Sequence, residues 1–341
     1  MTKNNIKLKE TMTTGDSSAA ALEHSSGWLQ HFPIALFASV MGLTGLSIAW
    51  LKGAHVLGLP MVVSDVLRYF ATAVWFVIVG FYLLKLSRFP AAVHEERAHP
   101  VKLNFFAAIS VGLILIAIAW TPSAPGLAAW FWFVGAVVHL LFTLMTVNIW
   151  IFRPPFKMPQ LTAAWFIPAV GNILVPIVGL QYAPADVSWF FFSVGFVFWL
   201  VLMTLLCYRL FFYEPLPLKL QPTLFIMIAP PAAGFLAYLS LNNGQLDAFA
   251  KILYFSALFL TLLLAMQARH FLRIPFFLTA WGYSFPLAAM TIATLEMATL
   301  SAWGFYLIFG SAMLTLVTLL IVILMVKTLL AMVQGKVFIP E

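Results

Sequence analysis

The stretch TLFIMIAPPAAGFLAYLSL, residues 223–241, is long and apolar enough to cross a bilayer, yet it carries Pro230 and Pro231 near its middle. Proline removes a backbone donor and clashes with the preceding turn. At membrane depth it is tolerated only where neighbouring groups or cavity water satisfy the freed carbonyls. This segment therefore predicts a kinked helix that lines a path.

The same feature recurs elsewhere in the chain, and it follows the order of the apolar segments. Prolines inside membrane-length segments fall only in odd-numbered ones: Pro33, Pro168, Pro176, Pro230, Pro231 and Pro286. The third segment has only Gly112 near Ser110 instead. A general enrichment of proline in membrane helices predicts no such alternation. The pattern favours kinked odd helices around a central pore, with straighter even helices outside.

The composition indicates an all-α integral membrane protein. Of the 341 residues, 63% are hydrophobic and 9% are charged, whereas soluble domains carry about 25% charged residues. Cys207 is the single cysteine, which excludes an internal disulfide and any metal site built from several thiolates. The sequence also lacks a phosphate-binding loop and a Gly-x-Ser-x-Gly elbow, so neither an enzyme nor an ATP-driven pump is indicated and no cofactor is expected.

A window of about 19 residues predicts ten transmembrane helices, which form five helical hairpins. The predicted spans are 31–51, 64–86, 103–120, 127–150, 162–180, 187–211, 223–241, 248–266, 276–295 and 303–330. We expect residues 1–27 to form a disordered polar tail, residues 28–334 the ten-helix transmembrane domain, and residues 335–341 a short second tail.

The distribution of cations predicts the orientation. With ten spans both termini lie on one side, and only Lys52, Arg68 and Lys251 of the 18 Lys and Arg residues fall on the other, which leaves 18 − 3 = 15. The positive-inside rule then makes both termini cytoplasmic. We expect a multi-pass protein of the cytoplasmic (inner) membrane.

Titratable groups are scarce inside the predicted spans. His139 is the only ionisable residue near the middle of a span, and Glu296 lies near the end of the ninth. Charged groups at membrane depth normally mark ion pathways or proton relays. We interpret His139 as a structural histidine bonded to a backbone group or hydroxyl, with a proton relay as the alternative. The odd helices carry no acidic ring of the kind that selects cations.

Three motifs resemble the tellurite-resistance/dicarboxylate transporter family, which includes malate transporters and the slow-type plant anion channels. Residues 61–67 (MVVSDVL) with 71–75 (ATAVW) look like the family's second span. Residues 237–247 (AYLSLNNGQLD) resemble the connection between its seventh and eighth spans, and residues 280–287 (AWGYSFPL) its ninth. The motifs occur in the expected order, and the resemblance covers about residues 32–338.

The resemblance implies ten helices in five hairpins, a pore within the odd helices, and an aromatic gate on the ninth helix. By motif position the gate is Phe285. It also implies a homotrimer with one pore per protomer. Further lining candidates follow from the kinks and from the family's pore helices: Phe37, Ala38, Pro168, Gly171, Pro230, Pro231 and Pro286. Packing against other helices or lipid is the alternative for these residues.

Two functions remain open at this point. The first is an anion channel or channel-like uniporter for small inorganic or organic anions, such as chloride, gated by Phe285. The alternative is a proton-coupled secondary transporter of a C4-dicarboxylate such as malate, or of a tellurite-related oxyanion. Coupling needs a titratable group, and His139 and Glu296 are the candidates. Membrane lipid is an expected partner, and nucleic acid is not.

Overall fold

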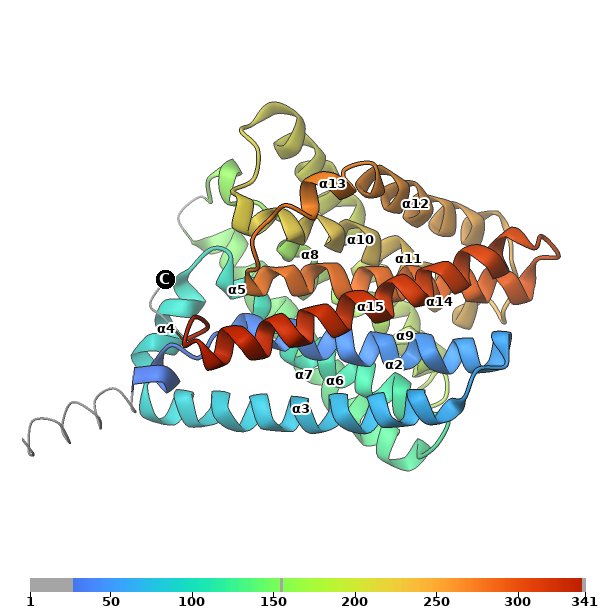
Figure 1. Ribbon diagram of the computed structural model, residues 1–341, viewed down its shortest axis with the longest axis horizontal. Helices are drawn as coiled ribbons and strands as arrows, with labels where there is room; N and C mark the ends of the chain where they lie inside the picture. Colours follow the sequence, from blue (N-terminus) through green and yellow to red (C-terminus); the bar gives the residue numbers. More distant parts are fainter. Residues whose placement is uncertain (1–26, 154–155, 339–341) are drawn as a thin grey trace, which may run out of the picture.

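The computed structural model describes residues 27–153 and 156–338, and within them every regular element is helical. Long helices run roughly parallel to one another and form an inner and an outer layer (Figure 1). The predicted tail residues 1–26 and 339–341 lie outside the described residues. The all-helical membrane fold expected from the composition is confirmed.

Five long helices without internal breaks form the outer layer. They are α3 (Met61–Arg88), α7 (Pro125–Phe152), α10 (Ala185–Phe212), α12 (Ala248–Ala265) and α15 (Phe305–Val333). In the most apolar window of each, only 22% to 33% of the residues are buried. Exposed apolar residues such as Phe259 and Leu319 are what a lipid-facing helix requires. These helices are the even-numbered segments, as predicted.

The odd-numbered segments form the inner layer, and each is divided into shorter helices. They comprise η1 (Ile34–Leu36) with α2 (Phe37–Leu57), α5 (Lys102–Phe105) with α6 (Ala107–Trp120), η3 (Ala163–Trp165) with α8 (Phe166–Val170), η4 (Gly171–Leu174) and α9 (Pro176–Gly179), η5 (Leu218–Ile228) with α11 (Ala229–Leu241), and η6 (Leu278–Tyr283) with α14 (Ser284–Leu300). Between 61% and 94% of the window is buried in the first, third and seventh segments. The predicted division into inner odd and outer even helices is therefore observed.

The short helices α4 (Pro90–Ala98), η2 (Met158–Gln160) and α13 (Ala268–Phe271) lie in connections between the long ones. Among the described residues, eight helices are long and apolar enough to cross a membrane. The fifth segment is a shorter apolar run, Ala163–Gly179. In the ninth, the α-helical part has 17 residues. The count of ten spans therefore stays a prediction.

The breaks differ in form from the kinks that the prolines predicted. Pro230 and Pro231 open α11 and Pro176 opens α9, each in the first turn. Pro286 is the third residue of α14, and α14 begins directly after the 3₁₀ helix η6. The first N–H groups of an α-helix have no partner within that helix, so proline costs little there. The inner segments change helix type at these sites instead of bending a continuous α-helix.

Side chains from the outer helices bond to carbonyls of the broken segments. The Thr143 hydroxyl donates to the Pro168 carbonyl at 2.7 Å. Trp132 Nε1 donates to the Val175 carbonyl, just before Pro176, at 2.9 Å. Trp75 Nε1 donates to the Ile109 carbonyl at 3.0 Å. The outer layer thus adds side-chain donors to backbone carbonyls of the inner layer, for which lipid offers no donor.

Both ends of the described chain meet at one end of the bundle (Figure 1). The ring of Phe338 stacks on Phe32 with centroids 5.9 Å apart, and Trp28 lies edge-on to Phe338 at 5.6 Å. At the same end of the bundle, the Lys85 ammonium pairs with Glu96 of α4 at 3.0 Å and donates to the Phe32 carbonyl at 2.8 Å. Together these contacts fix the start of the first inner segment.

The Lys85–Glu96 pair yields a stability prediction, because Lys85 is only 1% exposed. Replacing Glu96 with Gln would leave a buried ammonium without its carboxylate, and losing one partner of a buried pair costs about 3–5 kcal/mol. We expect Glu96→Gln to lower the free energy of unfolding in detergent by that amount. Glu95→Gln is the matched control, because Glu95 is exposed. Equal losses in the two variants would contradict the structural role of the pair.

Candidate functional site

The five broken segments enclose a cavity of about 410 Å³. Each contributes lining residues, among them Ile48 of α2, Leu115 of α6, Ile177 of α9, Leu236 of α11 and Ala289 of α14. Most of the lining belongs to the later part of each segment, so the cavity lies toward the end of the bundle opposite residues Trp28 and Phe338, near the ends of the described chain. Its walls are mostly apolar, and their polar residues are Ser240, Asn243 and Glu296.

One face of α14 runs along the whole cavity. Phe285, Ala289, Ile292 and Glu296 line it at spacings of four, three and four residues, which keeps them on one side of an α-helix. At 1.5 Å per residue, Phe285 and Glu296 are about 16 Å apart along the helix. Phe285 therefore lies at the deep end of this face and Glu296 at the outer end.

The Phe285 ring is held against α2 at a point where α2 has no side chain. The residue is 7% exposed, and a Cβ added to Gly45 would lie 3.1 Å from its Cδ2 atom. Gly42, one turn earlier, allows a similarly close approach to Ser284. These two glycines let α14 approach α2, and they leave the space that the ring occupies.

The outer end of the cavity carries an ion pair and a tight turn. The Lys52 ammonium of α2 pairs with the Glu296 carboxylate, so the acidic group at this end has a cationic partner. The turn after α11 reaches the cavity through Asn243 and Gly244, which both adopt left-handed backbone conformations with φ of 53° and 73°. Beyond it, Asp247 caps the start of α12.

Several residues predicted to line a pore lie away from this cavity. Phe37 is fully buried and lies edge-on to Tyr82 of α3, with ring centroids 6.0 Å apart. Among all the candidates, only Phe285 and Glu296 line the cavity; those that do not are Phe37, Ala38, Pro168, Gly171, Pro230, Pro231, Pro286 and His139. Apart from Pro286 and the outer-helix residue His139, each of these precedes the lining part of its own segment. That these residues line a pore on the other side of Phe285 from the cavity stays a prediction.

His139 lies in a buried polar cluster between α7 and two inner segments. It is 0% exposed, and its Nδ1 atom is 2.9 Å from the Ser110 hydroxyl. A Cβ at Gly171 would lie 2.7 Å from the ring, so only glycine fits there. Nearby, Asn172 donates to the Thr143 hydroxyl at 2.8 Å. The histidine thus joins elements of the fold and has no contact with the cavity.

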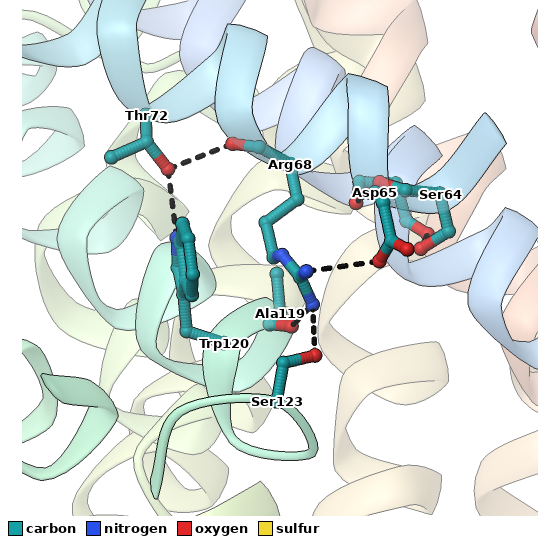
Figure 2. Close-up of polar contacts among 8 residues, drawn as sticks. Ser64, Asp65, Arg68, Thr72, Ala119, Trp120 and Ser123 are labelled. Carbon is teal, nitrogen blue, oxygen red and sulfur yellow. Dashed lines mark hydrogen bonds and ion pairs between the residues drawn. The ribbon is translucent and has the colours of Figure 1, made fainter. Parts of the chain in front are cut away.

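A second polar cluster, shown in Figure 2, joins α3 to α6. The Arg68 guanidinium lies between the Asp65 carboxylate, at 2.9 Å, and the face of Trp120, at 4.5 Å from the ring centroid. It also donates to the Ser123 hydroxyl, and Trp120 Nε1 donates to Thr72 at 3.0 Å. Arg68 is 5% exposed, so this cation contributes to the fold and is not free to attract anions.

Comparison with known proteins assigns the family. Residues 31–329 match the sequence profile described as SLAC1, voltage-dependent anion channel. The chain belongs to this family. It is 27% identical over 330 residues to the S-type anion channel SLAH3 of Arabidopsis thaliana, which covers 94% of the chain and 52% of SLAH3. The chain therefore spans about half the length of that plant relative.

Two microbial relatives of this SLAC1-family chain have a similar length. The chain is 28% identical over 266 residues to the tellurite resistance protein TehA homolog of Haemophilus influenzae, and the match covers 76% of the chain and 79% of the relative. The chain is also 25% identical over 337 residues to an uncharacterized transporter of Methanocaldococcus jannaschii, and this match covers 91% of the chain and 98% of the relative. The SLAC1 family thus includes anion channels and transporters, and the chain is a multi-pass membrane protein.

Asp247 provides a pH-dependent test of the turn that borders the cavity. The Ala250 N–H, and after it the Tyr238 hydroxyl, hold the pKa of this carboxyl below its usual range. Because the pKa is lowered in the folded state, the stabilisation is present above about pH 4, the unfolded value, and is lost as the pH falls through the folded value. We expect Asp247→Ala to lower the thermal unfolding midpoint at neutral pH, with a difference that shrinks on acidification.

The control for this prediction is Asp186→Ala. Asp186 is exposed in the first turn of α10 and caps no helix through its side chain. Unfolding midpoints of the wild type and both variants, measured in detergent from about pH 3 to pH 7, test the prediction. A loss for Asp247→Ala that is independent of pH, or equal to that of Asp186→Ala, would contradict it.

Proposed function

We propose that this chain is an anion channel, or a channel-like uniporter, of the cytoplasmic (inner) membrane, with Phe285 as the gate. The observation that carries the proposal is the cavity of about 410 Å³ walled by all five broken segments, with Phe285 at the deep end of the α14 face. Membership of the SLAC1 family supports the choice of anions as permeants. The bundle end at which Trp28 and Phe338 meet is then the cytoplasmic side.

The charges along the cavity also favour anions. Its lining contains a single carboxylate, Glu296, and that group is paired with Lys52. No acidic ring is therefore present among the described lining residues to concentrate cations. Because the walls offer few polar partners, an anion binds weakly, and weak binding allows fast throughput.

A proton-coupled transporter is the weaker candidate on this geometry. Coupling needs a titratable group in contact with the path. His139 is fully buried outside the cavity, and Glu296 is occupied by Lys52. Because the family also includes transporters, this alternative can be tested by measuring flux. A flux that collapses with the proton gradient would favour it.

The gate prediction concerns the Phe285 ring. Removing the benzyl group by Phe285→Ala deletes the side chain that fills the deep end of the cavity, so we expect a steady anion-selective current in planar bilayers. The wild type under the same conditions should carry at least about tenfold less, a difference equivalent to about 1.4 kcal/mol. The reversal potential should follow the chloride gradient.

Two controls accompany this recording. Phe285→Leu retains most of the bulk and should stay largely closed. Phe259→Ala removes an equal volume from a 64% exposed position on α12, outside the cavity, and should behave like the wild type. A Phe285→Ala protein that folds but carries no more current than Phe259→Ala would overturn the gate assignment.

The ion pair at the outer end predicts a charge effect on conductance. Lys52→Gln leaves Glu296 unpaired and should reduce anion current, whereas Glu296→Gln leaves Lys52 unpaired and should increase it. One unit charge about 7 Å from a passing ion in water contributes about 0.6 kcal/mol, a two- to threefold change. All of these currents are measured in the Phe285→Ala background. The current of the double variant should return toward that of Phe285→Ala with both charges present. Currents that are unchanged in both single variants would contradict the effect.

For the assembly, we propose a homotrimer in which each protomer keeps its own pore. The cavity is built from one chain, so a protomer contains every lining residue. The exposed apolar faces of the outer helices are available for lipid and for neighbouring protomers. Mass measurement of the detergent-solubilised protein tests the trimer.

A further inference from the structure

Three cationic side chains are buried in the described part of the chain, and one of them has no acidic partner. Arg68, Lys85 and Arg209 are 5%, 1% and 2% exposed. Arg68 pairs with Asp65 and Lys85 with Glu96. For Arg209, both Nε and Nη1 are enclosed and have no hydrogen-bond partner. A buried guanidinium without an anion is strongly unfavourable, because its lost hydration is not replaced.

Acidic residues near Arg209 in the chain do not provide the missing anion. Glu214 follows it by five residues, is exposed, and forms no ion pair with it among the described residues. Among the other cations at this end, Lys157 and Lys219 are exposed and are not buried with Arg209. Arg209 therefore has two guanidinium nitrogens, which carry three N–H groups, without hydrogen-bond partners.

The depth of Arg209 along α10 matches the headgroup layer of a membrane. The helix has 28 residues and is about 42 Å long, whereas the hydrocarbon core is about 30 Å thick. Arg209 lies three residues before the end of the helix, about 5 Å from it. Its neighbours Tyr208, Phe211, Phe212 and Tyr213 are 40% to 74% exposed, and exposed aromatic residues are typical of the membrane interface.

The neighbouring inner segment brings a further unpaired donor to the same level. A Cβ at Gly195 of α10 would lie 2.8 Å from the Ile173 nitrogen, which sets the two segments side by side. Arg209 is 14 residues further on, about 21 Å along the helix. Going back from Ile173, the 11 residues to Thr162 cover a similar distance. Thr162 Oγ1 is also buried without a partner at this depth.

We propose that Arg209 binds a phosphate-type oxyanion at this end of the molecule. The planar guanidinium presents paired N–H donors that match two oxygens of a phosphate group. Binding supplies the anion that Arg68 and Lys85 obtain from carboxylates of the chain itself. Two sources share this chemistry, the phosphodiester of a lipid headgroup and free inorganic phosphate. The site is separate from the cavity, so it does not depend on the proposed channel function.

The test measures ligand-dependent thermal unfolding of the purified full-length protein in detergent. The probes are dioleoyl phosphatidylglycerol, dioleoylglycerol with the same acyl chains but no phosphate, and inorganic phosphate. We expect phosphatidylglycerol to raise the unfolding midpoint of the wild type and dioleoylglycerol to leave it unchanged. A rise with inorganic phosphate as well would mean that free phosphate also occupies the site, whereas a rise with the phospholipid alone assigns the headgroup as the source.

Substitutions locate the effect. Arg209→Gln should weaken the apparent affinity for the phosphate ligand at least tenfold, whereas Lys219→Gln removes an exposed cation from the same end and should change it less than twofold. Arg209→Lys keeps the charge but loses the paired donors, so its apparent affinity should lie between those of Arg209→Gln and Lys219→Gln. If Arg209→Gln does not fold, Arg209→Lys is measured in its place. Equal responses to the phospholipid and to dioleoylglycerol, or equal affinities in the wild type and the Arg209 variants, would overturn the proposal.

Discussion

The requirement that backbone polar groups be satisfied inside a bilayer determines the arrangement of this protein. A broken helix has carbonyls that its own turns cannot pair, and lipid offers them no donor. The five broken segments therefore occupy the inside, and five continuous helices separate them from the surroundings. The outer helices also supply donors, as Thr143 does to the Pro168 carbonyl and Trp132 to the Val175 carbonyl. The broken inner segments thus depend on the continuous outer helices, which shield them from lipid and supply donors.

This constraint explains how much of the fold the sequence predicted. Prolines are visible in a sequence, and their confinement to odd segments indicated which helices lie inside. The third segment has no proline inside it, yet it too is divided, with α5 ending at Phe105 and α6 beginning at Ala107. Its apolar window is 94% buried although no proline marks it, so only the alternation of the segments predicted its inner position.

The form of the breaks and most of the cavity were beyond prediction. A proline indicates an interruption but does not distinguish a bend from a change to a 3₁₀ helix, because both satisfy the same local restriction. Lining residues such as Ile48 and Leu115 are apolar residues among many others, and only the tertiary arrangement separates them. Phe285 was found through family resemblance, whereas the Lys52–Glu296 pair joins residues 244 positions apart, a distance over which sequence periodicity says nothing.

The site combines an apolar chamber with charges that neutralise each other. Its polar features gather at the outer end, where Lys52 offsets Glu296 and the Asn243–Gly244 turn forms part of the rim. The deep end is formed by a ring resting on the bare backbone at Gly45. The described lining of the chamber thus offers few groups for specific hydrogen bonds.

The contact between the first and ninth segments has a consequence for biosynthesis. The backbone of α2 approaches α14 at Gly42 and Gly45, and Trp50 of α2 donates to Thr318 of α15 at 3.0 Å. During synthesis, α2 is therefore complete long before α14 and α15, its neighbours in the folded bundle, have been translated. Until then the inner ring lacks its fifth segment. The ring consequently closes only after α14 has joined the four inner segments that precede it in the chain.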